Sequence, residues 1–304
     1  MAEKTDLAIV VLHYGDPSLT VNCLRSLDGC GASIYLVENG PEGPQGQEQP
    51  DPGPGVRIIR TGANLGFAGG MNAGIRQALS DGSRFIAIMN NDTEAEPGFA
   101  EKIMEKFLGR EGGKVCFSPL ITDASGDSVW FGGGRMSWIG ARAKHFGFGS
   151  RQMPAEEAES GFLTGCVLCF PGEAAEKAGL MKEDYFLYWE DIDWSARLRR
   201  KGFRLMVFPD VRVRHLGSAS SGLESDSYLY YYHRNQLVFL ARNCPFILLP
   251  FAFGGVCLNL VRVCAAWLLR HGADGRRKAK ASLRGFADFF LGRRGRMPSP
   301  AGAS

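Results

Sequence analysis

Runs of strand length alternate with helical patterns over the first 120 residues. The strand-length runs lie at 7–12, 34–37, 56–60 and 85–89. Helices are predicted to start at Asp16-Pro17, to cover 69–80, and to run over 97–108, where proline suits a first helical turn. This alternation predicts an α/β fold, a mostly parallel sheet with helices on both faces. Ligands of such sheets bind at the carboxyl ends of the strands, so the polar residues there are the candidates for chemistry.

The second half of the chain is less regular. Residues 41–55 contain five Pro and four Gly, which predicts a mobile surface loop, and 120–160 show no clear periodicity. Further on, the pattern predicts a strand at 162–170, a helix at 172–179, an aromatic and acidic patch followed by a helix through 200, short strands at 205–208 and 211–215, and an aromatic-rich helix at 226–242.

The C-terminal region combines apolar and basic segments. Residues 244–261 carry no charge, and after Arg262 a second apolar stretch reaches residue 269. Eighteen residues is the lower limit for a membrane span, and Pro245, Pro250 and Asn259 count against one. We therefore favour a pair of amphipathic helices lying on a membrane, with a true span as the alternative.

Charge is concentrated just beyond these helices. Residues 270–296 hold nine Lys and Arg against two Asp, a net charge of +7, which leaves −4 on the rest of a chain whose total is +3. A basic tail on a mildly acidic body argues against a nucleic-acid-binding domain. It favours an anionic partner for the tail, such as a membrane surface.

Cysteine usage and the first residues bear on location. Cys166 and Cys169 form a CxxC pair that could suggest redox or zinc chemistry. They lie in an apolar run, and residues three apart on a strand point to opposite faces, so we predict buried thiols. Lys4 and Asp6 stand where a signal peptide would be apolar, so we expect a reducing, cytoplasmic location.

Two candidate clusters come early in the chain. Glu38-Asn39-Gly40 follows the second strand, where a carboxylate can accept hydrogen bonds from a nucleoside, although Asn-Gly is also ordinary turn chemistry. The glycine-rich segment 64–72 opens a helix, and free N–H groups at a helix start favour anions such as a diphosphate. It is neither a Walker motif nor a dinucleotide fingerprint.

The third cluster, Asn90-Asn91-Asp92-Thr93, follows the fourth strand. Its oxygens could hold Mg²⁺ or Mn²⁺ on a diphosphate, and the alternative is a cap for the following helix. In the fourth cluster, Glu190, Asp191 and Asp193 are set among aromatic residues. Crowding and apolar neighbours raise carboxyl pKa values toward those of a general base, whereas a structural interpretation makes these acids complements of a helix dipole.

In order and spacing, these clusters resemble the bacterial family 2 glycosyltransferases, specifically the rhamnosyltransferase and galactofuranosyltransferase-like branch. The matching segments fall within about residues 7–243 and read VVLHYGDPSLTVNCLRSL, LVENG, NLGFAGGMNAGI, IMNNDTEAEPGF, GFLTGCVLCF, YFLYWEDIDWSARLRRKGFRL, VRHLGSASS and YYYHRNQLVFL. The resemblance implies a GT-A fold in residues 1–243 and an inverting single displacement. The apolar and basic segments described above predict a separate C-terminal unit at 244–304 that associates with a membrane or packs on the domain.

The resemblance also implies roles for individual residues. Asp191 matches the general base, with Glu190 beside it, while Asp92 matches the metal-binding acid and His215 a residue near the diphosphate or metal. The donor nucleotide is expected to contact Glu38, Asn39, Asn64, Gly66, Gly69, Gly70, Asn72 and Asn91. Two departures stand out: Glu38 replaces the usual Asp, and the metal motif reads Asn-Asn-Asp, with one certain carboxylate.

The expected donor is dTDP-rhamnose or a UDP-sugar, and the expected acceptor is a glycan or a polyprenyl-linked glycan. The enzyme is then expected to be cytoplasmic and peripheral on the inner face of the cell membrane. Two alternatives remain. A sugar-nucleotidyltransferase would carry a basic, glycine-rich loop after the first strand, where this chain reads His13-Tyr14-Gly15-Asp16. A non-catalytic glycan- or lipid-binding protein would have no need of the acids at 92 and 191.

Overall fold

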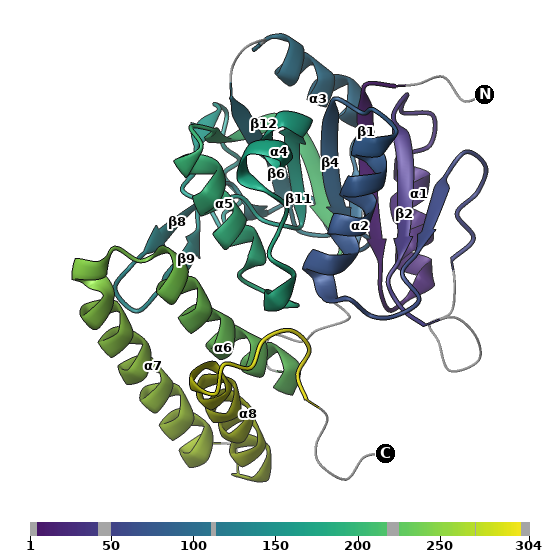
Figure 1. Ribbon diagram of the computed structural model, residues 1–304. Coiled ribbons are helices and arrows are strands. Elements are labelled where there is room, and N and C mark those ends of the chain that lie inside the picture. The colour runs from purple at the N-terminus through teal and green to yellow at the C-terminus, as the bar shows by residue number, and fades with distance from the viewer. Residues whose placement is uncertain (1–4, 42–49, 111–113, 218–224, 271, 299–304) are drawn as a thin grey trace.

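A single mixed sheet forms the centre of the molecule (Figure 1). The computed structural model describes residues 5–41, 50–110, 114–217, 225–270 and 272–298, so 42–49 of the Pro/Gly-rich loop and the end of the VRHLGSASS segment lie outside the described residues. The strand order is β10-β12-β6-β11-β4-β1-β2-β3, with β5 paired to β12 and β7 to β6. The bounds are β1 Leu7–His13, β2 Ser33–Glu38, β3 Arg57–Arg60, β4 Phe85–Asn90, β5 Thr93–Ala95, β6 Val115–Thr122, β7 Val129–Phe131, β10 Ala158–Glu159, β11 Val167–Pro171 and β12 Arg204–His215.

Strand direction places the candidate residues. Strands β3, β2, β1 and β4 run parallel to one another, and β6 is parallel to β12, while β11 runs antiparallel between β4 and β6. The carboxyl ends of β2 and β4 therefore meet at one edge of the sheet, as the sequence predicted. Every residue of β1 is buried, as expected for a central strand covered on both faces.

Helices cover both faces of the sheet. Helices α1 (Pro17–Ser26) and α3 (Phe99–Leu108) pack with the odd-numbered side chains of β1, and α2 (Gly66–Ser80), α4 (Gly172–Ala178) and α5 (Glu190–Arg200) pack with the even-numbered ones. Helix α1 begins as predicted, because the Asp16 carboxylate accepts the Ser18 N–H at 2.8 Å. The predicted mostly parallel sheet with helices on both faces is confirmed.

Several predicted strand bounds are wrong. The run 162–170 contributes only β11, because Leu163 N binds the Ser195 hydroxyl at 3.0 Å and Gly165 N binds Asp191, contacts incompatible with a sheet ladder. The predicted strands at 205–208 and 211–215 form one strand, β12, whose register shifts between Phe208 and Arg212. Residues 120–160, without periodicity, hold the short strands β7 and β10 and a separate hairpin of β8 (Gly134–Ser137) and β9 (Arg142–His145).

The CxxC cysteines are buried, as predicted, and both are free thiols. Burial raises the pKa of the Cys166 and Cys169 thiols well above the ordinary value, which makes both poor nucleophiles. The prediction that they point to opposite faces is wrong. Cys166 precedes β11, and both side chains join the same hydrophobic cluster.

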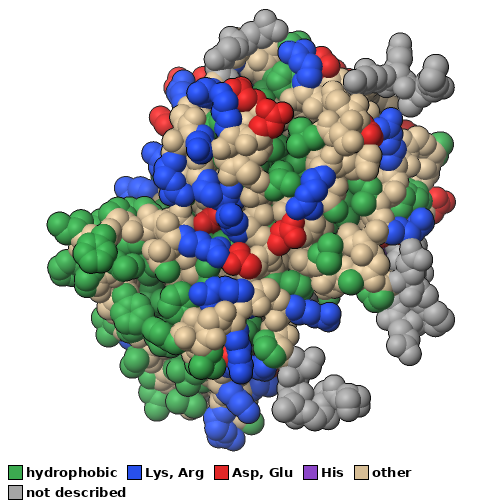
Figure 2. All heavy atoms as spheres, viewed as in Figure 1, with side chains coloured by type: hydrophobic (Ala, Val, Ile, Leu, Met, Phe, Trp, Pro, Cys, Tyr) green, Lys and Arg blue, Asp and Glu red, His purple; other side chains and the backbone are tan. Residues whose placement is uncertain are grey.

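Three helices follow the sheet: α6 (Asp226–Asn243), α7 (Leu249–Arg270) and α8 (Gly272–Phe290), with the 3-10 turn Phe246–Leu248 ahead of α7. They form a layer beside one end of the sheet (Figure 1). Helix α7 buries a stripe of residues four apart, Ala252, Val256, Leu260 and Cys264. Its other face exposes apolar side chains, which gather over α7 in Figure 2.

Candidate active site

Asp92 and His215 lie together at the carboxyl edge of the sheet, although 122 residues lie between them in the sequence. Asp92 follows β4, His215 ends β12, and Asp92 Oδ2 is 3.4 Å from His215 Nε2. Strand pairing enforces this, because His215 pairs with Thr93 and Leu216 N donates to Asp92 O at 2.8 Å. Both side chains are buried, and Asp92 Oδ1 and His215 Nδ1 have no hydrogen-bond partner. The predicted juxtaposition is confirmed.

Asp191 is tied to the same strand end through two consecutive residues. Gly165 N donates to Asp191 Oδ2 at 2.9 Å, and Cys166 O accepts Asn90 N at 2.9 Å. Besides burial, the charges of both Asp92 and Asp191 raise the pKa of the Cys166 thiol, as expected if each carboxylate lies close to it. The segment 165–166 therefore contacts both Asp191 and the end of β4, which Asp92 follows by two residues.

The three acids at the start of α5 have different environments. Burial, and next the charge of Asp191, raises the pKa of Glu190 well above its ordinary value. Loss of hydration also raises the pKa of Asp191, while the N–H groups of Gly165 and Ile192 and the nearby His145 oppose the rise. Asp193 differs from both, because its carboxylate binds Arg197 Nε at 2.8 Å and accepts a hydrogen bond from Asn243. Asp193 is thus a structural residue, whereas Asp191 is half-buried.

A strained turn presents these acids. Phe186, Tyr188 and Trp189 all adopt positive φ, at 65°, 65° and 76°. Such angles cost free energy in non-glycine residues and persist only when surrounding contacts impose them. Here Asn235 Nδ2 lies 2.9, 2.7 and 3.0 Å from the carbonyl oxygens of Tyr185, Leu187 and Tyr188.

Arg234 completes this support. Its side chain is fully buried and donates to Tyr185 O at 2.8 Å and to Gly295 O at 2.6 Å. It also lies over the Tyr230 and Tyr231 rings, so the buried guanidinium is surrounded by acceptors and aromatic faces. Arg234 and Asn235 lie in the matching segment YYYHRNQLVFL, but no role was predicted for them from the sequence.

The glycine-rich segment differs from expectation. Helix α2 begins at Gly66, and its first N–H groups are already engaged: Gly66 N binds Asn64 Oδ1 at 2.9 Å, and Phe67 N binds Phe186 O at 2.7 Å. The expectation that these two groups are free for a diphosphate is therefore wrong. Gly66 itself has a φ of 75°, and an added Cβ would lie 2.3 Å from Phe186 O.

Several predicted donor residues also serve the protein's own structure. Asn39 holds the turn before α2, donating to Gly66 O at 3.0 Å and accepting Leu65 N at 3.0 Å. Gly70 is required by packing, because an added Cβ would lie 2.5 Å from Leu12 Cδ1, and a Cβ at Gly69 would meet Leu65. Asn72 donates to Met181 O and Glu183, each at 2.9 Å.

Two further predicted residues form polar contacts at the strand ends. The buried Glu38 carboxylate lies 2.8 Å from Arg60 Nε, so a basic side chain from β3 already faces this acid. Asn91 Nδ2 donates to the Thr20 hydroxyl at 2.8 Å, and that hydroxyl is 2.7 Å from His13 Nδ1.

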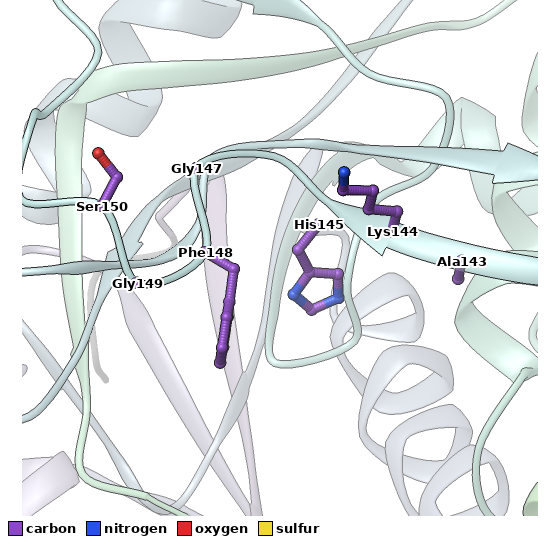
Figure 3. Close-up of a pocket in the computed structure, with 7 residues that line it drawn as sticks. All are labelled: Ala143, Lys144, His145, Gly147, Phe148, Gly149 and Ser150. Atoms are coloured by element: carbon purple, nitrogen blue, oxygen red, sulfur yellow. The ribbon is translucent and has the colours of Figure 1, made fainter.

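Sequence reasoning missed Trp130 and His145. The Trp130 ring lies 4.4 Å from the His215 ring, and its carbonyl oxygen is 3.3 Å from His145 Nδ1. Burial lowers the pKa of His145, whereas the hydrogen bond to Trp130 O and then the charge of Asp191 oppose this shift. His145 also lines a cavity of about 770 Å³ together with Lys144, Phe148 and their neighbours (Figure 3).

Comparison with known proteins identifies relatives of this chain. Residues 34–167 match the family model described as Glycosyl transferase family 2. The chain is 28% identical over 230 residues to an N-acetylglucosaminyl-diphospho-decaprenol L-rhamnosyltransferase of Mycobacterium tuberculosis, covering 69% of this chain and 74% of that protein. It is 26% identical over 200 residues to the dTDP-rhamnosyl transferase RfbF of Shigella flexneri, covering 62% and 64%.

Solved structures agree on the fold. The crystal structure of GalNAc-T7 with UDP, GalNAc and Mn²⁺ superposes with a TM-score of 0.59 at 13% identity, covering 96% of this chain and 57% of that longer one. At that identity the likeness concerns the fold alone. The structure thus has a GT-A-like fold, and over residues 34–167 the chain is similar to glycosyltransferase family 2, to which the rhamnosyltransferase relatives also point.

Proposed function

We propose that the protein is an inverting glycosyltransferase that moves a sugar from a nucleotide diphosphate to the hydroxyl group of an acceptor, with Asp191 as the general base. The observation that carries the proposal is the link through Gly165 and Cys166. This link supports the proposal because Gly165 binds the Asp191 carboxylate while Cys166 binds Asn90, two residues before the Asp92 that pairs with His215.

The different environments of Asp191 and Glu190 give these two acids different roles in the proposal. An acceptor hydroxyl is a poor nucleophile until a carboxylate takes its proton, and a base with a raised pKa does so more effectively. Asp191 is held by two backbone N–H groups, which fix the direction of its free lone pairs. Glu190 is the more deeply buried and stays protonated to higher pH, so it does not compete as the base. A single base facing the sugar on the side opposite the leaving group gives inversion.

Asp92 and His215 fit a divalent cation. Each buries a polar atom that has no protein partner, Oδ1 and Nδ1 respectively. No group of three or more metal-binding side chains occurs among the described residues, so the donor's own phosphates would complete the coordination. A carboxylate with an imidazole suits Mn²⁺ better than Mg²⁺, which prefers oxygen alone. When bound, the cation would neutralise charge developing on the diphosphate leaving group.

The relatives' printed activities guide the choice of substrates. Both transfer rhamnose, one of them to a diphospho-decaprenol acceptor. We propose dTDP-rhamnose first and a UDP-sugar second as the donor, and a polyprenyl-diphosphate-linked sugar as the acceptor. Residues Glu38, Asn39, Asn64, Gly66, Gly69, Gly70, Asn72 and Asn91 form or shape the wall of the donor site in this proposal.

The C-terminal unit, residues 244–304, is proposed to hold the enzyme on the cytoplasmic face of a membrane. The segment Phe246–Leu269 is long and apolar enough to span a bilayer. However, its stripe from Ala252 to Cys264 packs within the protein, and crossing would break that packing. The exposed side, with Phe246 90% and Leu269 86% exposed, suits a helix lying at the interface. Arg277, Lys278 and Arg293 form ion pairs within the protein, so the remaining basic residues of the tail supply the attraction to anionic lipid.

Product analysis tests the function directly. Purified protein is incubated with dTDP-rhamnose or a UDP-sugar, with Mn²⁺, and with or without a diphosphate-linked acceptor. Release of nucleoside diphosphate that depends on the acceptor, with a product of inverted anomeric configuration, is the expected result. Formation of a nucleotide sugar from sugar phosphate and nucleoside triphosphate would instead identify a nucleotidyltransferase. Donor binding without turnover would identify a binding protein.

A further inference from the structure

The β8–β9 hairpin carries three basic side chains on one face. Arg135 lies directly opposite Lys144, and Ser137 lies opposite Arg142. Paired residues share a face and alternate residues along a strand return to it, so Arg135, Arg142 and Lys144 all project from the same side. All three are exposed, and none forms an ion pair with another described residue. We call these three residues the basic face of the hairpin.

This arrangement of like charges would destabilise an isolated hairpin. Like charges directly opposite each other on a strand pair are destabilising, and a two-stranded hairpin has little intrinsic stability to offset them. The hairpin persists because its turn is anchored elsewhere: Gln236 Nε2 donates to the carbonyl oxygens of Gly140 and Ala141, each at 3.0 Å. Rigidly held, unneutralised basic side chains are typical of a surface that binds an anion.

The hairpin connects the active site with the apolar helix. At one end, β9 finishes at His145, which binds Trp130 O and lines the cavity with Lys144 (Figure 3). At the other end, the turn meets α7 so closely that a Cβ added at Gly255 would lie 2.7 Å from Gly140 N. Arg142 Nη2 also reaches Asn259 Oδ1 of α7 at 3.3 Å. Figure 1 shows the hairpin beside the beginning of α7.

His145 pairs with Gly134 on the opposite face of the hairpin, so Lys144 is the residue of the basic face that reaches the cavity lined by His145. The basic face therefore extends from this cavity, at one end of the hairpin, toward α7 with its exposed Phe251 and Leu258, at the other. We propose that the basic face binds the diphosphate of a lipid-linked acceptor, with the acceptor sugar in the cavity that Lys144 and His145 line and the lipid chain toward α7. An acceptor with a sugar, an anionic linker and an apolar chain presents the complementary groups in the same order. This inference rests on the proposed glycosyl transfer and adds the site that selects the acceptor.

The kinetic test uses two acceptors that differ only in the anion. One is N-acetylglucosaminyl diphosphate bearing a short alkyl chain, and the other is an alkyl glycoside of N-acetylglucosamine, which lacks the diphosphate. The combined variant Arg135→Gln/Lys144→Gln should raise KM for the diphosphate acceptor on the order of 10-fold, the scale of losing two charge-assisted contacts. Its KM for the donor and for the glycoside should stay unchanged, and Lys144→Arg should retain wild-type affinity.

A matched variant controls for net charge. Arg25→Gln/Lys201→Gln removes two exposed basic side chains from α1 and the end of α5 and should leave every KM unchanged. An equal rise in KM for both acceptors, or no rise for either, would overturn the proposal. So would loss of binding to phosphatidylglycerol vesicles by Arg135→Gln/Lys144→Gln with an unchanged KM for the diphosphate acceptor in detergent, because the basic face would then bind lipid headgroups.

A binding measurement separates this inference from the proposed function. With the donor site saturated by nucleoside diphosphate, farnesyl diphosphate should bind the wild type about 10-fold more tightly than the Arg135→Gln/Lys144→Gln variant. Farnesol should bind both proteins equally. Equal binding of farnesyl diphosphate would overturn the inference whether or not transfer occurs, whereas failure of the wild type to use any acceptor would count against the proposed function alone.

Discussion

Replacing Asp191 by Asn tests the base assignment, and the structure sets the expected size of the effect. The carboxylate accepts Gly165 N at 2.9 Å and Ile192 N at 2.8 Å. An amide has one oxygen and can keep only one of these bonds, while its NH₂ group faces the other N–H, a loss of about 1–3 kcal/mol in stability. Removing a poorly hydrated charge offsets part of that loss, so the variant should remain folded.

The effect on turnover should be much larger. Loss of a general base lowers kcat by about 10²–10⁴-fold, or about 3–5 kcal/mol in the activation barrier. KM for the donor should change by less than about threefold, because Asp191 acts on the acceptor. Asp193→Asn is the matched control: it makes the same chemical change two residues away, where the carboxylate binds Arg197, and should reduce stability more than turnover.

The pH dependence of activity provides an independent test of Asp191 as the base. Loss of hydration raises the pKa of Asp191, and only the deprotonated form is a base. Activity of the wild type should therefore fall, as the pH decreases, at a higher pH than an ordinary Asp would give, and this limb should vanish in Asp191→Asn. Initial rates measured between about pH 4 and 9 decide the matter. Turnover within about threefold of wild type with the acid limb intact would refute the assignment.

Four further perturbations have definite expected outcomes. Asp92→Asn should abolish the rise in Tm that Mn²⁺ gives in the presence of nucleoside diphosphate, and EDTA should do the same to the wild type; an unchanged rise would exclude Asp92 as a ligand. Burial raises the folded-state pKa of Glu190 above its unfolded value, so its contribution to stability is present below about pH 4.5 and is lost as pH rises through the folded pKa. Glu190→Gln should accordingly flatten the fall in Tm as the pH rises above about 4.5, and an undiminished slope would contradict the burial argument. Asn235→Leu leaves the carbonyl groups of Leu187 and Tyr188 without this donor, while Tyr185 O keeps Arg234, and should cost about 2–4 kcal/mol in the free energy of unfolding, with a loss of kcat; urea denaturation and initial rates measure the two effects. Phe251→Glu, at a side chain that is 69% exposed, should weaken sedimentation with anionic vesicles several-fold at an unchanged Tm, and unaltered sedimentation would argue against α7 as the membrane contact.

Local signals predicted the parts of the fold that depend on neighbours in sequence. Asp16 and Pro17 specify the start of α1 through a cap that involves only residues 16–18. The alternation of strands and helices predicted the sheet, and strand ends predicted that Asp92 and His215 would meet. The prediction of a strand over the whole run 162–170 was wrong for a physical reason. Its first half is apolar because it is buried, but its backbone hydrogen bonds go to Ser195 and Asp191, about 30 residues away.

Other parts of the site depend on contacts that no local pattern encodes. His145 comes from a short strand in a region without periodicity, and its significance lies in its nearness to Trp130 and Asp191. The glycines of α2 illustrate the opposite case, because the sequence suggested space for a ligand. At Gly66 and Gly70 the missing Cβ makes room for Phe186 and Leu12. A glycine-rich helix start can therefore indicate either space for a ligand or close packing, and only the surrounding structure distinguishes the two.

The contact between the segment after α8 and the strained turn at 186–189 determines where the chain can be truncated. Gly295 N donates to Asp184 O at 2.7 Å, Gly295 O accepts Arg234, and Arg234 in turn holds Tyr185 O. A chain ended at residue 243 would keep every residue of the acid cluster but would leave a buried guanidinium facing an empty acceptor position. If the proposed function is right, the segment expected to contact the membrane also supports the turn that carries Asp191, so truncating it should impair catalysis as well as attachment.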